Sequence, residues 1–197
     1  MDPRIPGRAT PVGVTRTTKT YPMGGALAAV LVAVGVAVLV HAGLLLPSWV
    51  DWNAAQVEAD LDGDGAEEVL GLSGRRMQVV ETDGSVSQAP QEWKVSDAFA
   101  VDVDGDGLLE VVALVWKRGS FGPSRPFWIE KDNQGYSQHV FVLRYADGGF
   151  DQVWLSSDIR MDARKAWFDD DARLHLVTLD GQESIWTWGE WGFVLVE

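Results

Sequence analysis

The chain has 197 residues, with 10 tryptophans, no cysteine and a formal net charge of −13 at pH 7. At about 100 to 200 residues per domain, this length fits one domain with an accessory segment and excludes a large multidomain enzyme. The acidity excludes nucleic acid as a partner, because phosphate backbones bind a basic surface. The lack of cysteine excludes disulfides, thiolate zinc sites and cysteine nucleophiles.

The first 46 residues have the pattern of a membrane anchor. Residues 1–23 hold four basic residues and one acidic residue, and we predict a basic cytoplasmic tail. Residues 24–46 carry no charge, and this length exceeds the ~20 residues that a helix needs to cross a bilayer, so we predict one transmembrane helix. The positive-inside rule then places the rest of the chain outside the cell membrane. A cleaved signal peptide is the alternative, although its apolar core is usually about 7 to 15 residues long.

The remainder of the chain has the pattern of β-strands. After a juxtamembrane linker at 47–58, we predict an all-β domain at 59–197. Short runs rich in β-branched and aromatic residues, bounded by Gly, Asp and Ser, predict its strands. These runs are 68–72, 77–81, 110–116, 140–145, 175–179 and 184–188. No long stretch shows the apolar periodicity of a helix. A long loop is expected at 117–138.

An acidic segment recurs in this domain. DLDGDGAEE at 60–68 and DVDGDGLLE at 102–110 each precede an apolar run, and WFDDDARLH at 167–175 is a third, divergent copy. Three units of about 40 residues, each with three or four strands, are typical of propeller blades. Closed propellers have about 4 to 8 blades, so an open stack of sheets, a compressed barrel-like form and completion by oligomerisation all remain open.

The spacing of the acidic residues predicts two structural Ca²⁺ sites, because calcium binds 6 to 8 oxygen ligands and a D-x-D-x-D loop wraps carboxylates around one point. In the first copy the predicted ligands are Asp60, Asp62, Asp64, the backbone carbonyl of Ala66, and Glu68. In the second copy they are Asp102, Asp104, Asp106, the backbone carbonyl of Leu108, and Glu110. An EF-hand is excluded because its twelfth residue is Glu, whereas Gly71 and Ala113 stand there. Acidic surface turns without metal are the alternative.

The third copy is expected to bind no metal. Aligned position by position, it has Trp167 and His175 where the other copies have their first and last carboxylates. Asp169 and Asp171 alone leave too few ligands for calcium.

The segments DLDGDGAEEVLGL and DVDGDGLLEVVAL resemble the calcium loops of FG-GAP/VCBS repeats, which form the blades of integrin α-subunit propellers and occur in many bacterial surface proteins. The resemblance covers about residues 59–197. It implies an array of four-stranded blades with calcium between strands, serving adhesion, carbohydrate or protein binding, or scaffolding.

We predict no catalytic site, because the chain has 3 histidines and no G-x-S-x-G, H-E-x-x-H or phosphate-binding motif. The predicted function is a membrane-anchored binding or scaffolding module of the cell envelope, with an unknown protein or glycan partner and possible homo-oligomerisation. One alternative is an accessory subunit of an envelope biosynthesis or export complex. The other is a carbohydrate-binding module that uses Trp186, Trp188 and Trp191, for which packing between blades is the competing interpretation.

Overall fold

The computed structural model describes residues 23–41, 44–52, 54–121 and 125–196. The chain divides into two compact units, Met1–Ala37 and Val38–Glu197. Helix α1 (Met23–His41) ends before residue 46, where the predicted transmembrane segment ends. Across the described ranges, no helix has both the length and the apolarity needed to cross a membrane. The predicted cytoplasmic tail lies outside the described residues apart from Met23.

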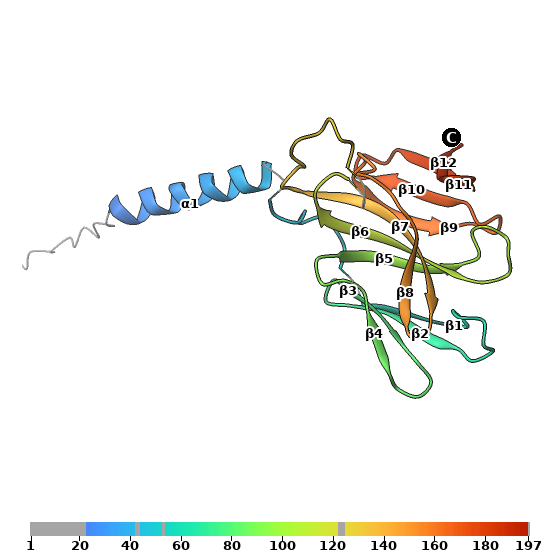
Figure 1. The fold of residues 1–197 in the computed structure, drawn as a ribbon. Helices are drawn as coiled ribbons and strands as arrows, with labels where there is room; N and C mark the ends of the chain where they lie inside the picture. Colours follow the sequence, from blue (N-terminus) through green and yellow to red (C-terminus); the bar gives the residue numbers. More distant parts are fainter. Residues whose placement is uncertain (1–22, 42–43, 53, 122–124, 197) are drawn as a thin grey trace, which may run out of the picture. The chain divides into compact units, whose positions relative to one another are not determined.

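The larger unit is built from antiparallel sheets, which confirms the predicted all-β class (Figure 1). Sheet A contains β1 (Ala55–Ala59), β2 (Glu68–Ser73), β3 (Arg76–Val80) and β4 (Val86–Gln88). Sheet B contains β5 (Lys94–Val101), β6 (Glu110–Arg118), β7 (Tyr136–Ala146) and β8 (Gly149–Leu155). Sheet C contains β9 (Ala163–Phe168), β10 (Leu174–Thr178), β11 (Glu183–Gly189) and β12 (Gly192–Leu195).

Each sheet is a meander in which strands that follow one another in the chain are hydrogen-bonded neighbours. Tight turns make this possible. Between β7 and β8, for example, Asp147 and Gly148 have φ of 50° and 73°, the left-handed conformation that short hairpin turns require. Each of the three predicted repeat units therefore forms one four-stranded sheet.

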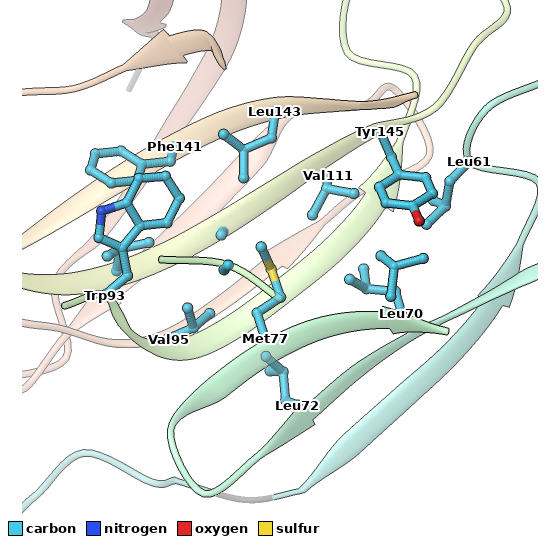
Figure 2. Close-up of a cluster of buried hydrophobic side chains, with 14 residues drawn as sticks. Leu61, Leu70, Leu72, Met77, Trp93, Val95, Val111, Phe141, Leu143 and Tyr145 are labelled. Atoms are coloured by element: carbon cyan, nitrogen blue, oxygen red, sulfur yellow. The ribbon is translucent and has the colours of Figure 1, made fainter. Parts of the chain in front are cut away.

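Sheet B lies between the other two sheets, and its face toward sheet A carries the larger core (Figures 1 and 2). Met77 from β3 and Val111 from β6 are fully buried there, and Trp93 packs edge-to-face on Phe141 with ring centroids 4.7 Å apart. This core also contains Leu61, Leu70, Leu72, Val79, Ala89, Val95, Ala113, Val115, Leu143 and Tyr145.

The opposite face of sheet B packs on sheet C. Because side chains alternate along a strand, Val112 and Leu114 point away from Val111 and meet Leu174 and Leu176 of β10. Burial on both faces explains why the whole run from Glu110 to Trp116 is buried, and why this segment reads as continuously apolar rather than alternating.

The three sheets form an open stack. Among the described residues, the two buried clusters join sheet A to sheet B and sheet B to sheet C, and the strands do not close into a propeller. Of the architectures left open by the sequence for a single chain, the open stack is the one observed. The physical reason is that four-stranded sheets with one strongly apolar face can end the stack, while the doubly apolar sheet occupies its middle.

The segment predicted as a linker, 47–58, packs against the sheets. Trp49 contacts Trp116 edge-to-face with ring centroids 5.7 Å apart, and Trp52 lies under the guanidinium of Arg75 at 5.0 Å. Strand β1 begins inside this segment, at Ala55. The long loop is shorter than expected, because β6 extends to Arg118 and β7 begins at Tyr136.

Candidate metal sites

The two acidic copies form the connection between the first and second strands of their sheets. Loop 1 (residues 60–67) joins β1 to β2, and loop 2 (residues 102–109) joins β5 to β6. Their glycines adopt matching left-handed conformations, with φ of 79° and 90° in loop 1 and 77° and 90° in loop 2. Residues with a Cβ are strained at positive φ, whereas glycine is not. The glycines of D-x-D-G-D-G therefore allow both loops to adopt the same backbone conformation.

In loop 1 the aspartates fold the backbone around themselves. Asp60 accepts hydrogen bonds from the backbone N–H of Gly63 at 2.8 Å and of Gly65 at 3.1 Å. Asp62 and Asp64 each accept one bond from the N–H two residues later, at 3.1 and 2.7 Å. These bonds fix the directions of the carboxylates before any ligand is considered.

Glu68 closes loop 1 from the first position of β2. Its side chain is 1% exposed, and Oε2 accepts a hydrogen bond from the N–H of Leu61 at 2.8 Å. One oxygen from each of Asp60, Asp62 and Glu68 lies within 4.8 Å of the others. Ligands about 2.3 to 2.6 Å from a shared Ca²⁺ are separated by at most about 5.2 Å, so this spacing fits one ion.

Loop 1 is electrostatically strained without a cation. Burial raises the pKa of Glu68 above its ordinary value, although the hydrogen bond from Leu61 opposes this shift. The negative charges of Asp62, Glu81 and Asp64 raise it further. A bound cation would relieve both the desolvation and the repulsion of these carboxylates.

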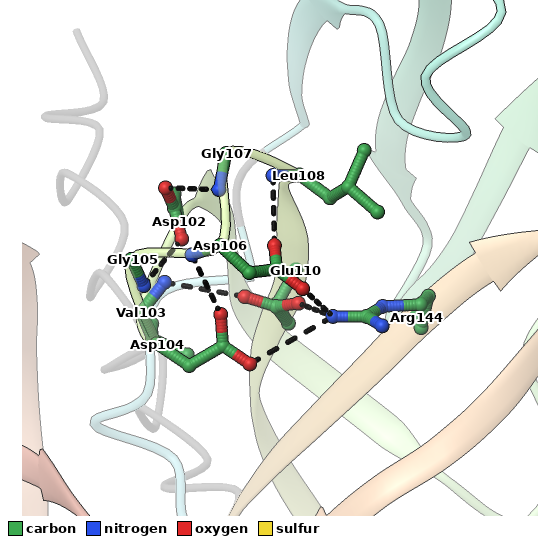
Figure 3. A network of polar contacts seen from close by, with 9 residues as sticks. All are labelled: Asp102, Val103, Asp104, Gly105, Asp106, Gly107, Leu108, Glu110 and Arg144. Atoms are coloured by element: carbon green, nitrogen blue, oxygen red, sulfur yellow. Dashed lines mark hydrogen bonds and ion pairs between the residues drawn. The ribbon is translucent and has the colours of Figure 1, made fainter.

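Loop 2 repeats the same hydrogen bonds (Figure 3). Asp102 accepts from Gly105 at 2.7 Å and from Gly107 at 3.0 Å, and Asp104 and Asp106 each accept from the N–H two residues later, at 3.1 and 2.9 Å. The loop backbone is therefore a copy of loop 1 in its polar contacts as well as in its dihedral angles.

Glu110 closes loop 2 as Glu68 closes loop 1. It is fully buried, and Oε2 accepts a hydrogen bond from the N–H of Val103 at 3.2 Å. Oxygens of Asp102, Asp104 and Glu110 also lie within 4.8 Å of one another. Two acidic triads are thus placed to hold a metal ion, with Asp64 and Asp106 outside the triads.

Loop 2 differs from loop 1 in one residue that sequence reasoning missed. Arg144 of β7 places Nη2 2.6 Å from Glu110 Oε1, 3.0 Å from Asp106 Oδ2 and 3.8 Å from Asp104 Oδ2 (Figure 3). The hydrogen bond to Glu110 raises the pKa of Arg144. Its position follows from the pairing of Glu110 with Arg144 between β6 and β7, which no local pattern reveals.

The divergent third copy forms a shorter connection. Loop 3 has five residues (169–173), against eight in loop 1, and Asp169 follows β9 directly as Asp60 follows β1. The position-by-position alignment that matched Trp167 with the first carboxylate is therefore wrong by two residues. The buried Leu174 begins β10 where Glu68 begins β2.

Basic side chains of the chain itself surround the carboxylates of loop 3. Asp169 Oδ2 lies 2.8 Å from Nη2 of Arg173 and 3.0 Å from Nε2 of His175, and Arg173 also contacts Asp171 at 3.0 Å. Hydrogen bonds from His175 and from Arg173 hold the pKa of Asp169 well below its usual range. This loop is closed by internal ion pairs.

The three tryptophans of the predicted sugar site do not form one exposed surface. Trp186 and Trp188 of β11 pack against the core between sheets B and C, and Trp188 lies 5.3 Å from Phe193 between ring centroids. Trp191 is 89% exposed in the turn between β11 and β12. The packing of the first two rings agrees with the competing interpretation of these residues as core.

Comparisons of the chain with models of protein families, with curated proteins and with solved structures find no match.

Proposed function

We propose that this chain is a calcium-binding β-repeat module in which Ca²⁺ held by loop 1 stabilises the first hairpin of the sheet stack. The observation that carries the proposal is the convergence of Asp60, Asp62 and Glu68 on one point. Among the described residues, no lysine or arginine forms an ion pair with the carboxylates of loop 1. A cation from solution is then the charge that balances them.

The donor set favours calcium over the other common divalent ions. Its side chains offer only carboxylate oxygens, whereas zinc sites contain histidine or cysteine. Magnesium requires a near-ideal octahedron at about 2.0 to 2.1 Å and retains several waters. A glycine-rich loop with closely spaced carboxylates suits the larger and more flexible coordination of calcium. The carboxylate of Asp64 and the carbonyl of Ala66 remain predicted additional ligands.

Titration calorimetry on the purified full-length chain tests this proposal. We expect Ca²⁺ to bind and Mg²⁺ to bind at least about tenfold more weakly. Asp62→Asn removes one charge but keeps an oxygen that can accept the backbone hydrogen bond, and it should abolish binding at loop 1. Asp83→Asn is the matched control, because Asp83 accepts the same kind of bond, from the N–H of Ser85 at 2.7 Å, in a turn without a triad. Absence of calcium binding to the wild-type chain would contradict the proposal, as would equal binding by the Asp62 variant.

We further propose that the module works outside the cell, anchored in the membrane, in binding or scaffolding at the envelope. The uncharged segment 24–46, the basic residues before it and the resemblance of the loops to FG-GAP/VCBS repeats support this role. Added protease should digest the β-domain on intact cells or spheroplasts while the chain remains in the membrane after carbonate washing. Release by carbonate, or protection of the domain until the cells are lysed, would contradict it.

A further inference from the structure

We infer that the guanidinium of Arg144 supplies in loop 2 the positive charge that a metal ion supplies in loop 1, so that loop 2 is closed to Ca²⁺ in the wild-type chain. The inference deepens the proposed function and rests on it for the ion at loop 1. It divides two loops that are alike in sequence and backbone into one metal site and one internal ion-pair site.

The contacts of Arg144 place its charge among the carboxylates of loop 2. One nitrogen, Nη2, meets the fully buried Glu110 at 2.6 Å and also Asp106 and Asp104, at 3.0 and 3.8 Å. A Ca²⁺ held by Glu110 and Asp104 would bind the same two carboxylates, at about 2.3 to 2.6 Å. The ion and the guanidinium are like charges, and they would compete for these carboxylates.

The corresponding position in sheet A carries the opposite charge. Glu110 and Arg144 are directly paired between β6 and β7. In sheet A, the pairing of Val69 with Val80, continued by one residue on each strand, brings Glu81 opposite Glu68. Loop 1 thus has an additional carboxylate where loop 2 has a guanidinium, and only loop 1 requires a cation from solution.

The side chain of Arg144 is well suited to this role. Its neighbour Tyr145 points to the other side of β7, where it is fully buried and donates a hydrogen bond to Glu81. The buried Nε of Arg144 has no hydrogen-bond partner among the described residues, and Nη2 donates the side-chain hydrogen bonds of this guanidinium to Asp106 and Glu110. Substitution by methionine retains much of the side-chain volume and removes the charge.

Counting the bound ions tests the inference. Titration calorimetry on the full-length chain should show that Arg144→Met binds one more Ca²⁺ than the wild type. Arg76→Met is the matched control, because it makes the same change in charge at a half-buried residue of β3 that is bonded to Gln88. The control should bind the wild-type number. An Arg144 variant that binds no additional ion would overturn the inference.

This comparison separates the two proposals. A wild-type chain that binds no calcium contradicts the proposed function, yet a gain of one ion on Arg144→Met would still support the role of Arg144. A wild-type chain that fills both loops with similar affinity overturns the inference and leaves the calcium function intact.

A second pair of variants leaves Arg144 in place, so this test does not depend on whether the Arg144→Met variant folds. Asp62→Asn in loop 1 should reduce the number of bound ions by one, whereas the matched change Asp104→Asn in loop 2 should leave the number unchanged. Loss of an ion on changing Asp104 would show that loop 2 binds calcium despite Arg144, and would overturn the inference.

Discussion

Arg144 is paired with Glu110 beside loop 2, and Glu81, which follows the last paired residue of β3, reaches the equivalent position beside loop 1 when that register is continued by one residue. The two side chains have opposite charges. The backbone of each loop is fixed by glycines and by bonds to aspartates, so it is largely independent of this difference. The affinity of each loop for a cation does depend on this difference, because it is set by the sum of the nearby charges. A single side chain on a neighbouring strand therefore decides what an acidic loop binds.

The contacts of His175 predict that the stability of sheet C depends on pH. Its ring lies between Glu183, at 2.8 Å from Nδ1, and Asp169, at 3.0 Å from Nε2, and it stacks on Trp167. The hydrogen bond with Glu183, and then that with Asp169, raise the pKa of His175. A raised pKa means that this histidine stabilises the fold fully below its unfolded pKa of about 6.5, and that the contribution is lost as pH rises through the folded pKa.

We therefore expect the difference in free energy of unfolding between the wild type and His175→Gln to be larger at about pH 6 than at about pH 8.5. Urea denaturation in the presence of EDTA measures it without interference from calcium. The comparison with the variant is needed because burial lowers the pKa of His139, which gives the opposite pH dependence in the same range. A difference that does not change with pH would contradict the assigned role.

At the scale of elements, the hairpin of β11 and β12 in sheet C packs on sheet B at a glycine, Gly192, which lies against Trp154. Gly192 has φ of 115°, and a Cβ there would lie 2.3 Å from the ring of Trp154 in β8. Gly181, in the turn between β10 and β11, has φ of 87° with nothing within 4 Å of its Cβ position. A side chain at either glycine would strain the backbone, but only a side chain at Gly192 would also clash with a neighbour.

This pair predicts unequal effects of alanine. Gly181→Ala should cost about 1 to 2 kcal/mol, the strain of a left-handed residue. Gly192→Ala should cost about 1 to 3 kcal/mol more, because the Trp154 ring must move from its contacts with Trp188 and Phe193. Urea denaturation of both variants measures the difference. Equal losses of stability would show that Trp154 moves without cost.

Half of the twelve strands in the described residues were predictable, because their signals are local. The six apolar runs identified in the sequence overlap β2, β3, β6, β7, β10 and β11 to within one residue at the end of β3 and of β10. Strands with weaker patterns were missed, such as the exposed β1 and the short β4. The alignment of the third copy failed because loop 3 lost three residues relative to loop 1, and a fixed spacing cannot detect a deletion.

Part of the candidate site was also predictable, because its acidic residues are close together in the sequence. The Asp and Glu residues of each triad are at most eight positions apart in the chain, so their spacing predicts their convergence. Arg144 reaches loop 2 only through the pairing of β6 with β7 across the long connection, and this depends on tertiary structure. Local spacing identifies carboxylates that could hold a cation, but it does not identify a basic side chain that contacts them from another strand.

At the scale of the whole molecule, stacking is decided by how many faces of each sheet are apolar. Sheet B is buried on both faces, and sheets A and C use one face each in the two cores. The number of repeats was readable from the sequence, whereas their closure was not, since it depends on contacts between sheets. Loop 1 and loop 2 also meet, because a Cβ on Gly63 would lie 2.8 Å from Leu108. An ion bound in loop 1, as proposed, would therefore act at the junction of sheets A and B.

Calcium bound in loop 1 is expected to stabilise this stack, and calorimetric melting of the full-length chain measures that effect most directly. With free Ca²⁺ at about 100 times its dissociation constant, binding adds about 2.7 kcal/mol, which should raise the melting midpoint by about 5 to 10 °C over that in EDTA. The midpoint of Asp62→Asn should be insensitive to calcium at the same concentration. A wild-type midpoint that is the same in calcium and in EDTA would contradict the account.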